Sequence, residues 1–295
     1  MSLLAFAAIA LTATIAAADR GIHEGPVVGG ANVPSNQEVL YRSYGECNDA
    51  FTSGITIRTV GGGNITIPPQ VAANAVWAEI FWVTLADAPD AGAVTVNGNA
   101  VAPLANGPVT VSPCWPQDFA FSYRANVLPF IQGGVNQLRG FAESGVDNVS
   151  PSTEGVTMVV VYRTNTADKE IVVLGGNDSA ILNQIDLAIP VVSAPGFGAE
   201  LTLVVADGQP ASDVALWNGL VISAPDAFQG LDPGPGIGYW DTQEYGVATG
   251  GGNVASVIGQ VDCLNWVATV LGVKRGGCVV PVEPSTWSKV KNRFN

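Results

Sequence analysis

The fold is decided by two stretches of sequence, Val94-Thr95-Val96-Asn97-Gly98 and Val214-Ala215-Leu216-Trp217-Asn218-Gly219. Each is a short run of strand-forming residues that ends in Asn-Gly, the pair favoured where both central residues of a hairpin turn take positive φ. A valine lies 33 residues after the start of each stretch, at Val127 and at Val247. The equal spacing predicts the same hairpin and the same later strand in two copies, with Val94 equivalent to Val214 and Val127 to Val247.

Landmarks on either side of the hairpins repeat at an offset of about 120 residues. In chain order they are Ile67-Pro68, Ala78-Glu79-Ile80 and Gly133-Gly134, then Ile189-Pro190, Ala199-Glu200-Leu201 and Gly251-Gly252. Self-similarity at a fixed period indicates repeated structural units. We therefore place a first β-sandwich at residues 37–152 and a second at residues 153–273.

The remainder of the chain indicates strands throughout. Short runs rich in Val, Ile and Thr are separated by Gly-Gly, Asn-Gly and Pro, as at residues 54–58, 75–85, 119–127, 156–163, 200–205 and 265–273. No stretch keeps a helical period between capping residues, so the pattern predicts an all-β protein whose sheets pack face to face.

The two ends of the chain differ from its body. Leu3 to Ala18 is uncharged and ends in Ala16-Ala17-Ala18, a pattern typical of a cleaved export signal and short of the ~20 residues of a membrane span. Residues 1–18 are therefore expected to be a signal peptide, with a retained apolar segment as the alternative. Residues 19–36 are expected to form an extended arm and residues 274–295 a basic tail.

Composition excludes several functional classes. The chain carries 12 Lys and Arg against 25 Asp and Glu, a net charge of −13, which is the wrong sign for a nucleic-acid partner. Residues 21–273 have a net charge of −17 and residues 274–295 a net charge of +4. His23 is the single histidine, so common Ser-His-Asp, Cys-His and His-rich zinc sites have almost nothing to be built on. The sequence predicts no enzyme and no small-molecule cofactor.

Four cysteines, Cys47, Cys114, Cys263 and Cys278, are spaced far apart. In an exported protein an even number of cysteines predicts disulfides, here two. Three pairings are compatible with the sequence.

Two sets of residues are candidates for binding. Trp217, Asn218, Tyr239, Trp240 and Asp241 combine aromatic rings with polar groups, as a sugar-stacking site requires, although large aromatics in a sandwich more often pack in the core. Calcium is a candidate ligand for the oxygen-rich loops that hold Asp87, Asp90, Asp207, Asp213, Asp232 and Asn177-Asp178, with ordinary polar turns as the alternative. The metal-binding residues are left unassigned.

A resemblance to known families adds to this interpretation. The hairpin stretches, together with Tyr123-Arg124-Ala125-Asn126-Val127 and Gly133-Gly134-Val135-Asn136, resemble the jelly-roll sandwich of the galactose-binding-like superfamily. Ser112-Pro113-Cys114-Trp115, residues 204–209 and Asp262-Cys263-Leu264-Asn265-Trp266-Val267 are similar to an uncharacterised family of secreted bacterial and archaeal surface proteins, a domain of unknown function. The resemblance implies two tandem jelly-roll-like sandwiches at the cell surface and implies no activity.

The sequence therefore predicts an exported, non-enzymatic structural or adhesive protein, cell-surface or extracellular, with a subunit of a filament or layer as one form. Its terminal segments are the expected means of self-assembly, because extended termini pair with open strand edges. The alternative is a carbohydrate-binding jelly-roll module whose partners are surface glycans.

Overall fold

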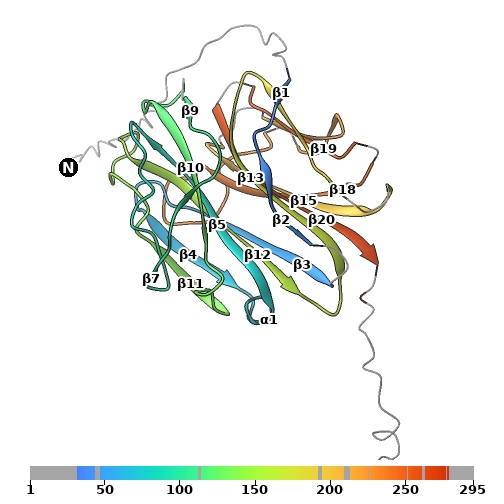
Figure 1. Cartoon of the computed structure of the whole chain (residues 1–295). Helices are drawn as coiled ribbons and strands as arrows, with labels where there is room; N and C mark the ends of the chain where they lie inside the picture. Colours follow the sequence, from blue (N-terminus) through green and yellow to red (C-terminus); the bar gives the residue numbers. More distant parts are fainter. Residues whose placement is uncertain are drawn as a thin grey trace, which may run out of the picture.

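A computed structural model describes residues 32–43, 47–111, 114–191, 195–208, 213–224, 226–250, 252–260, 263–276 and 278. The expected signal segment, most of the arm and residues 279–295 lie outside these ranges. The protein is all-β, as predicted, and four sheets form successive layers (Figure 1). In the described part of the chain no helix is long and apolar enough to cross a membrane.

The first sandwich pairs a larger sheet with a smaller one. The larger sheet has the order β3 (Asn48–Thr56), β12 (Ser152–Arg163), β5 (Ala75–Ala86), β10 (Phe119–Asn126) and β8 (Leu104–Ala105), with β9 (Thr110–Val111) also on β10. The smaller sheet has the order β4 (Gly62–Ile67), β11 (Gly134–Arg139), β6 (Thr95–Val96) and β7 (Asn99–Ala100). A short helix, α1 (Pro69–Ala73), connects β4 to β5.

The second sandwich is built in the same way. Its larger sheet has the order β18 (Trp240–Ala248), β15 (Gly198–Ala206), β20 (Cys263–Gly276), β13 (Asp168–Ile181) and β2 (Glu38–Ser43). Its smaller sheet has the order β1 (Val33–Pro34), β14 (Gln184–Ala188), β19 (Val254–Ile258), β16 (Val214–Trp217) and β17 (Leu220–Val221).

Eight strands of each sandwich have the same spatial order within their two sheets. The order β3-β12-β5-β10 matches β13-β20-β15-β18, and β4-β11-β6-β7 matches β14-β19-β16-β17. Two sheets of four antiparallel strands in this order form a jelly roll. Strand order alone does not establish common ancestry, so a duplication stays a prediction.

The two Asn-Gly hairpins have the same geometry. Asn97 and Gly98 have φ of 51° and 79°, and Asn218 and Gly219 have φ of 51° and 77°, as an Asn-Gly turn requires. In each hairpin a backbone N–H closes the loop at 3.0 Å, from Val101 to the carbonyl of Val94 and from Ile222 to that of Ala215. Val94 is therefore equivalent to Ala215, and the expected match to Val214 was wrong by one residue.

The expected domain boundaries need two corrections. β12 begins at Ser152 and runs across the expected boundary, yet it pairs with β3 and β5 at the centre of the first sandwich. β2 begins at Glu38, yet it pairs with β13 of the second. The strand ladders place residues 48–163 in the first sandwich and residues 168–276, together with β1 and β2, in the second. Lys274 and Arg275 accordingly belong to β20 and not to the tail.

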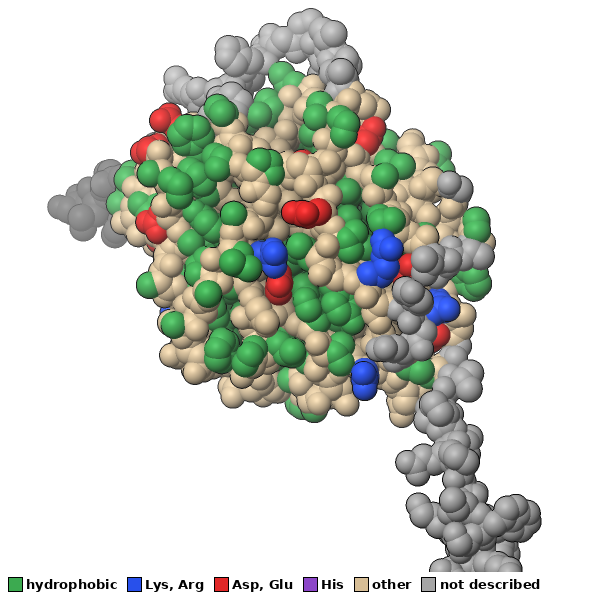
Figure 2. All heavy atoms as spheres, viewed as in Figure 1, with side chains coloured by type: hydrophobic (Ala, Val, Ile, Leu, Met, Phe, Trp, Pro, Cys, Tyr) green, Lys and Arg blue, Asp and Glu red, His purple; other side chains and the backbone are tan. Residues whose placement is uncertain are grey.

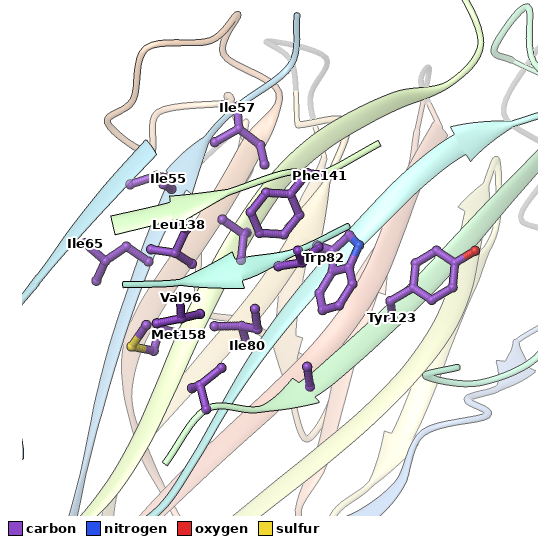
Figure 3. Close-up of a cluster of buried hydrophobic side chains, with 14 of the residues drawn as sticks. Ile55, Ile57, Ile65, Ile80, Trp82, Val96, Tyr123, Leu138, Phe141 and Met158 are labelled. Carbon is purple, nitrogen blue, oxygen red and sulfur yellow. The ribbon is translucent and has the colours of Figure 1, made fainter. Parts of the chain in front are cut away.

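Three hydrophobic cores hold the four layers together. One lies inside each sandwich, and Figure 3 shows the first, where Ile80 and Trp82 of β5 meet Leu138 of β11. The third lies between the two larger sheets, where Phe81 and Val83, the alternate residues of β5, are buried. Both faces of β5 and β12 are thus covered, which explains why residues 80–83 of β5 and 158–161 of β12 are apolar without alternation.

Candidate functional site

The long connection between β17 and β18 crosses from the second sandwich to the first. The amide of Thr56 donates to the carbonyl of Pro233 at 3.2 Å, and the amide of Ile237 donates to the carbonyl of Arg58 at 3.2 Å. A Cβ on Gly236 would lie 2.6 Å from the Arg58 nitrogen, so this close backbone approach requires glycine. The connection brings Tyr239 against Arg58.

The corresponding connection of the first sandwich, residues 101–118, contacts the second sandwich. The Asn106 Nδ2 lies 2.9 Å from Ser122 Oγ and 2.9 Å from the carbonyls of Gly176 and Val267. The Asn177 side chain of β13 in turn donates to the carbonyl of Pro108 at 2.7 Å. Each sandwich is therefore fastened to the other by its own longest connection.

A buried ion cluster lies at this junction, centred on Arg58. Its Nε lies 2.8 Å from Asp147 Oδ1, its Nη1 lies 3.3 Å from Glu154 Oε2, and its Nη2 donates to Asn148 Oδ1 at 2.6 Å. The Tyr239 ring lies 4.2 Å from the guanidinium carbon, a cation–π distance. Arg58 is 2% exposed and Glu154 is 0% exposed. These two side chains are closed to solvent, whereas Asp147 at the edge of the cluster is 41% exposed, and the cluster joins residues of both sandwiches.

Burial in the cluster raises the pKa of two of its glutamate carboxyl groups. Burial raises the pKa of Glu154 to about 7, against the opposing attraction of Arg58, and the nearby Glu143 and Asp147 carboxyls add to the rise. Burial likewise raises the pKa of Glu143, whose Oε2 accepts a hydrogen bond of 3.0 Å from the Thr153 amide. The Oε1 atoms of both glutamates are buried without a hydrogen-bond partner among the described residues. The Glu154 carboxyl therefore titrates near neutral pH, with a pKa of about 7.

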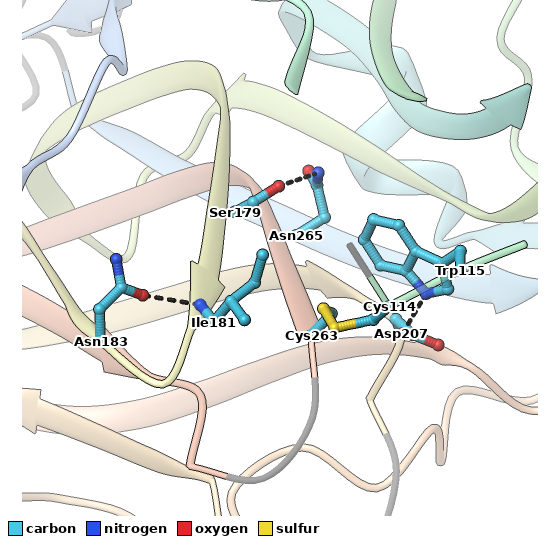
Figure 4. The surroundings of a disulfide bond; sticks show 8 residues. All are labelled: Cys114, Trp115, Ser179, Ile181, Asn183, Asp207, Cys263 and Asn265. Atoms are coloured by element: carbon cyan, nitrogen blue, oxygen red, sulfur yellow. Dashed lines mark hydrogen bonds between the residues drawn. A yellow bond between two sulfur atoms is a disulfide. The ribbon is translucent and has the colours of Figure 1, made fainter. Parts of the chain in front are cut away.

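One of the predicted disulfides is present, between Cys114 and Cys263 (Figure 4). Their Cα atoms are 6.0 Å apart across a sequence separation of 149. The bond joins the residues before β10 in the first sandwich to the start of β20 in the second. The indole N–H of Trp115 donates to Asp207, which adds another link between the sandwiches. Cys47 and Cys278 are free thiols in the structure.

The expected sugar-stacking residues do not form an accessible site. Trp240 and Asp241 are 0% exposed, and Trp217 is buried in the second core. Trp240 donates its indole N–H to Thr157 Oγ1 of the first sandwich at 2.8 Å. Asn218 shapes the hairpin turn by accepting a hydrogen bond of 2.8 Å from the Val254 amide. The prediction was wrong for Trp217, Trp240 and Asp241, because the junction and the second core use these side chains.

The oxygen-rich loops also serve the fold. Asp232 accepts from Thr242 Oγ1 at 2.7 Å, and Asp90 accepts from the Gly92 amide at 2.9 Å. Asp178 holds the N-terminal segment through Ser35 Oγ at 2.5 Å and the Asn36 amide at 2.9 Å. Within the described ranges no group of three or more His, Cys, Asp or Glu side chains is arranged to hold a metal ion.

The face drawn in Figure 2 carries few charged side chains, and apolar and uncharged polar side chains cover most of it. A surface cavity of about 480 Å³ lies beside the turn that joins β12 to β13, residues 164–167. It is lined by Gln70, Asn74, Tyr162, Arg163, Thr164, Asn165 and Thr166.

The residues of the ion cluster were missed by the sequence interpretation. Arg58 and Glu154 each lie in or beside an apolar strand run, and a charge in such a run is the signal that points to a buried pair. Tyr239 was singled out, but as a sugar contact. The contact of Tyr239 with Arg58 depends on the packing of one sandwich on the other, which no spacing in the sequence encodes.

No family model matches the chain, and no curated protein matches it either.

Proposed function

We propose that the protein is an exported, non-enzymatic structural or adhesive protein of the cell surface or extracellular space, and that copies assemble by strand addition. The observation that carries the proposal is a difference between the two sandwiches, which share one strand order but differ in how their sheet edges are completed.

In the second sandwich, the N-terminal segment of the chain adds a strand to one edge of each sheet. β1 pairs in parallel with β14, and β2 pairs antiparallel with β13. The equivalent edge strands of the first sandwich are β4 and β3. Among the described residues, no strand pairs with the outer edge of either one. The first sandwich thus offers the edges that the second has filled.

The backbone groups that face the open edge of β3 can be identified, and one of them, the Ala50 amide, already donates to Asp49 Oδ1 at 2.8 Å. The Thr56 backbone faces away from β12, since it bonds to Pro233, and alternation along the strand gives Asn48, Ala50, Thr52 and Gly54 the same direction. Residues 49–53 are half-buried. Such an edge accepts an extended segment from another chain by backbone hydrogen bonds.

We assign this role to the C-terminal tail of a second copy. The N-terminal segment from Val33 onward already pairs within its own chain, whereas residues 279–295 follow the last described strand. Residues 279–295 carry Lys289, Lys291 and Arg293 against Glu283, a net charge of +2, and residues 21–273 a net charge of −17, so the tail is attracted to the body of another copy. The signal-like residues 1–18 and the cross-sandwich disulfide support export.

The test is electron microscopy of producing cells that carry Thr52→Pro, with Thr52→Val as the matched control. Proline removes an outward amide that bonds to nothing in the described chain, and edge strands tolerate it. We expect fibres or a layer with the wild-type and Thr52→Val proteins and their loss with Thr52→Pro. Assemblies unchanged by Thr52→Pro would exclude the β3 edge, and cells without any assembly would contradict the proposed function.

A further inference from the structure

Cys47 and Cys278 lie at the same four-residue turn between the sandwiches, residues 164–167. The carbonyl of Cys47 accepts from the Thr164 amide at 2.8 Å, and its amide donates to Asp168 Oδ1 at 3.2 Å. The Cys278 Sγ donates to the carbonyl of Ala167 at 2.9 Å and lies 3.4 Å from that of Thr164. The two cysteines are far apart in sequence, and the turn brings them together.

The positions of both cysteines are fixed by strand ladders that end beside them. Asn48, which follows Cys47, pairs with Arg163, and Gly276, two residues before Cys278, pairs with Asp168. Cys47 also has φ of 53°, a left-handed conformation that a residue other than glycine adopts only where its surroundings impose it.

Desolvation, and then a hydrogen bond with the Cys47 side chain, raise the pKa of the Cys278 thiol to about 11. Both cysteines are half-buried residues.

We infer that Cys47 and Cys278 form a second disulfide in the exported protein, and that it fastens the far end of β20 to the first sandwich. The oxidant is a disulfide-bearing thiol oxidoreductase or a small-molecule disulfide. One cysteine thiolate attacks the donor disulfide, the other cysteine displaces the donor, and two protons and two electrons leave the protein while the donor becomes a dithiol.

The consequence is a symmetrical attachment of β20. Its first residue, Cys263, is bonded to Cys114 of the first sandwich. Cys278 lies two residues beyond its last residue, Gly276. With both bonds closed, a pull on residues 279–295 passes to Cys47 at the start of β3 before it reaches the hydrogen bonds of β20. The inference holds whether or not copies assemble.

The test is a thiol count and a non-reduced peptide map of the full exported protein, purified with its free thiols blocked. We expect no blocked thiol and a peptide that joins Cys47 to Cys278. Cys47→Ser and Cys278→Ser should each expose one thiol per chain and leave the Cys114–Cys263 peptide intact. Blocked Cys47 and Cys278 in the wild-type protein, or a peptide that joins either to Cys114 or Cys263, would overturn the inference.

Discussion

The guanidinium carbon of Arg58 lies 4.2 Å from the centroid of the Tyr239 ring, and the two residues belong to different sandwiches. The same guanidinium is paired with Glu154 and Asp147 of its own sandwich. Arg58 therefore joins the buried charge of one sandwich to an aromatic side chain of the other. Replacing Tyr239 by Leu should lower the free energy of unfolding by about 1 kcal/mol, whereas Tyr239→Phe keeps the ring and should cost less. Urea unfolding of the two variants measures the difference, and equal losses would contradict a cation–π contribution.

Loss of Arg58 should be much more damaging than loss of the whole ion pair. At pH 8, where Glu154 is ionised in the folded protein, Arg58→Met leaves its carboxylate buried without a cation, which typically costs about 3–5 kcal/mol. The double variant Arg58→Met/Glu154→Leu removes both charges and should recover most of that loss. Urea unfolding of the three proteins tests this expectation, and a double variant as unstable as Arg58→Met would show that packing of the arginine, and not its charge, is what matters.

The raised pKa of Glu154 predicts a pH dependence of stability. The folded protein keeps the carboxyl protonated up to about pH 7, whereas the unfolded chain releases the proton near its ordinary value of 4.5. The folded state therefore binds more protons in this window, and the free energy of unfolding should fall as the pH rises through it, by on the order of 3 kcal/mol. Burial also raises the pKa of Asp232, to about 6, which acts in the same direction.

Urea unfolding between pH 4 and pH 8 measures this slope. Glu154→Gln should flatten the curve, since it removes the group that titrates. The exposed Glu244→Gln is the matched control and should leave the curve unchanged. A Glu154→Gln protein with the wild-type slope would assign the pH dependence to other groups.

Trp240 is expected to act in folding and not in sugar binding. A Cβ on Gly155 would lie 2.3 Å from its Cγ, so the indole is packed tightly against the backbone of β12. Trp240→Ala should cost about 3–5 kcal/mol, and the more conservative Trp240→Phe should remain folded. A glycan array that finds selective binding lost in folded Trp240→Phe would contradict the structural role.

The disulfide between Cys114 and Cys263 should contribute measurably to stability. It closes a loop with a sequence separation of 149, and removal of such bonds typically costs about 2–5 kcal/mol. Cys114→Ser/Cys263→Ser should unfold at a correspondingly lower urea concentration than the wild-type protein. An unchanged midpoint would mean that the buried junction holds the sandwiches together without the bond.

Much of the fold follows from local signals. The turn geometry of Asn97-Gly98 and Asn218-Gly219 is dictated by residues that favour positive φ, so the sequence predicts both hairpins correctly. The boundary at residue 152 was wrong because β12 and β13 are joined by only a short turn, and nothing in the local sequence says that β12 pairs backward with β3. The continuous apolar run of β5 did contain the signal for burial on both faces.

The junction was harder to predict because its chemistry is assembled from distant parts of the chain. Arg58 and Tyr239 are 181 positions apart, and their contact depends on which faces of the two larger sheets meet. Trp240 and Asp241 illustrate the same limit. An aromatic residue beside an acid is typical of a sugar-binding site, but here both side chains are buried.

Light scattering on the chain without residues 1–18, intact or ending at Cys278, tests the assembly most directly. The intact chain should associate at low salt, where residues 279–295, with a net charge of +2, are attracted to the acidic body of a neighbour, and should dissociate as salt screens that attraction. The shortened chain should be monomeric at both salt concentrations. An intact chain that stays monomeric under every condition, or a shortened chain that associates equally well, would contradict strand addition by the tail.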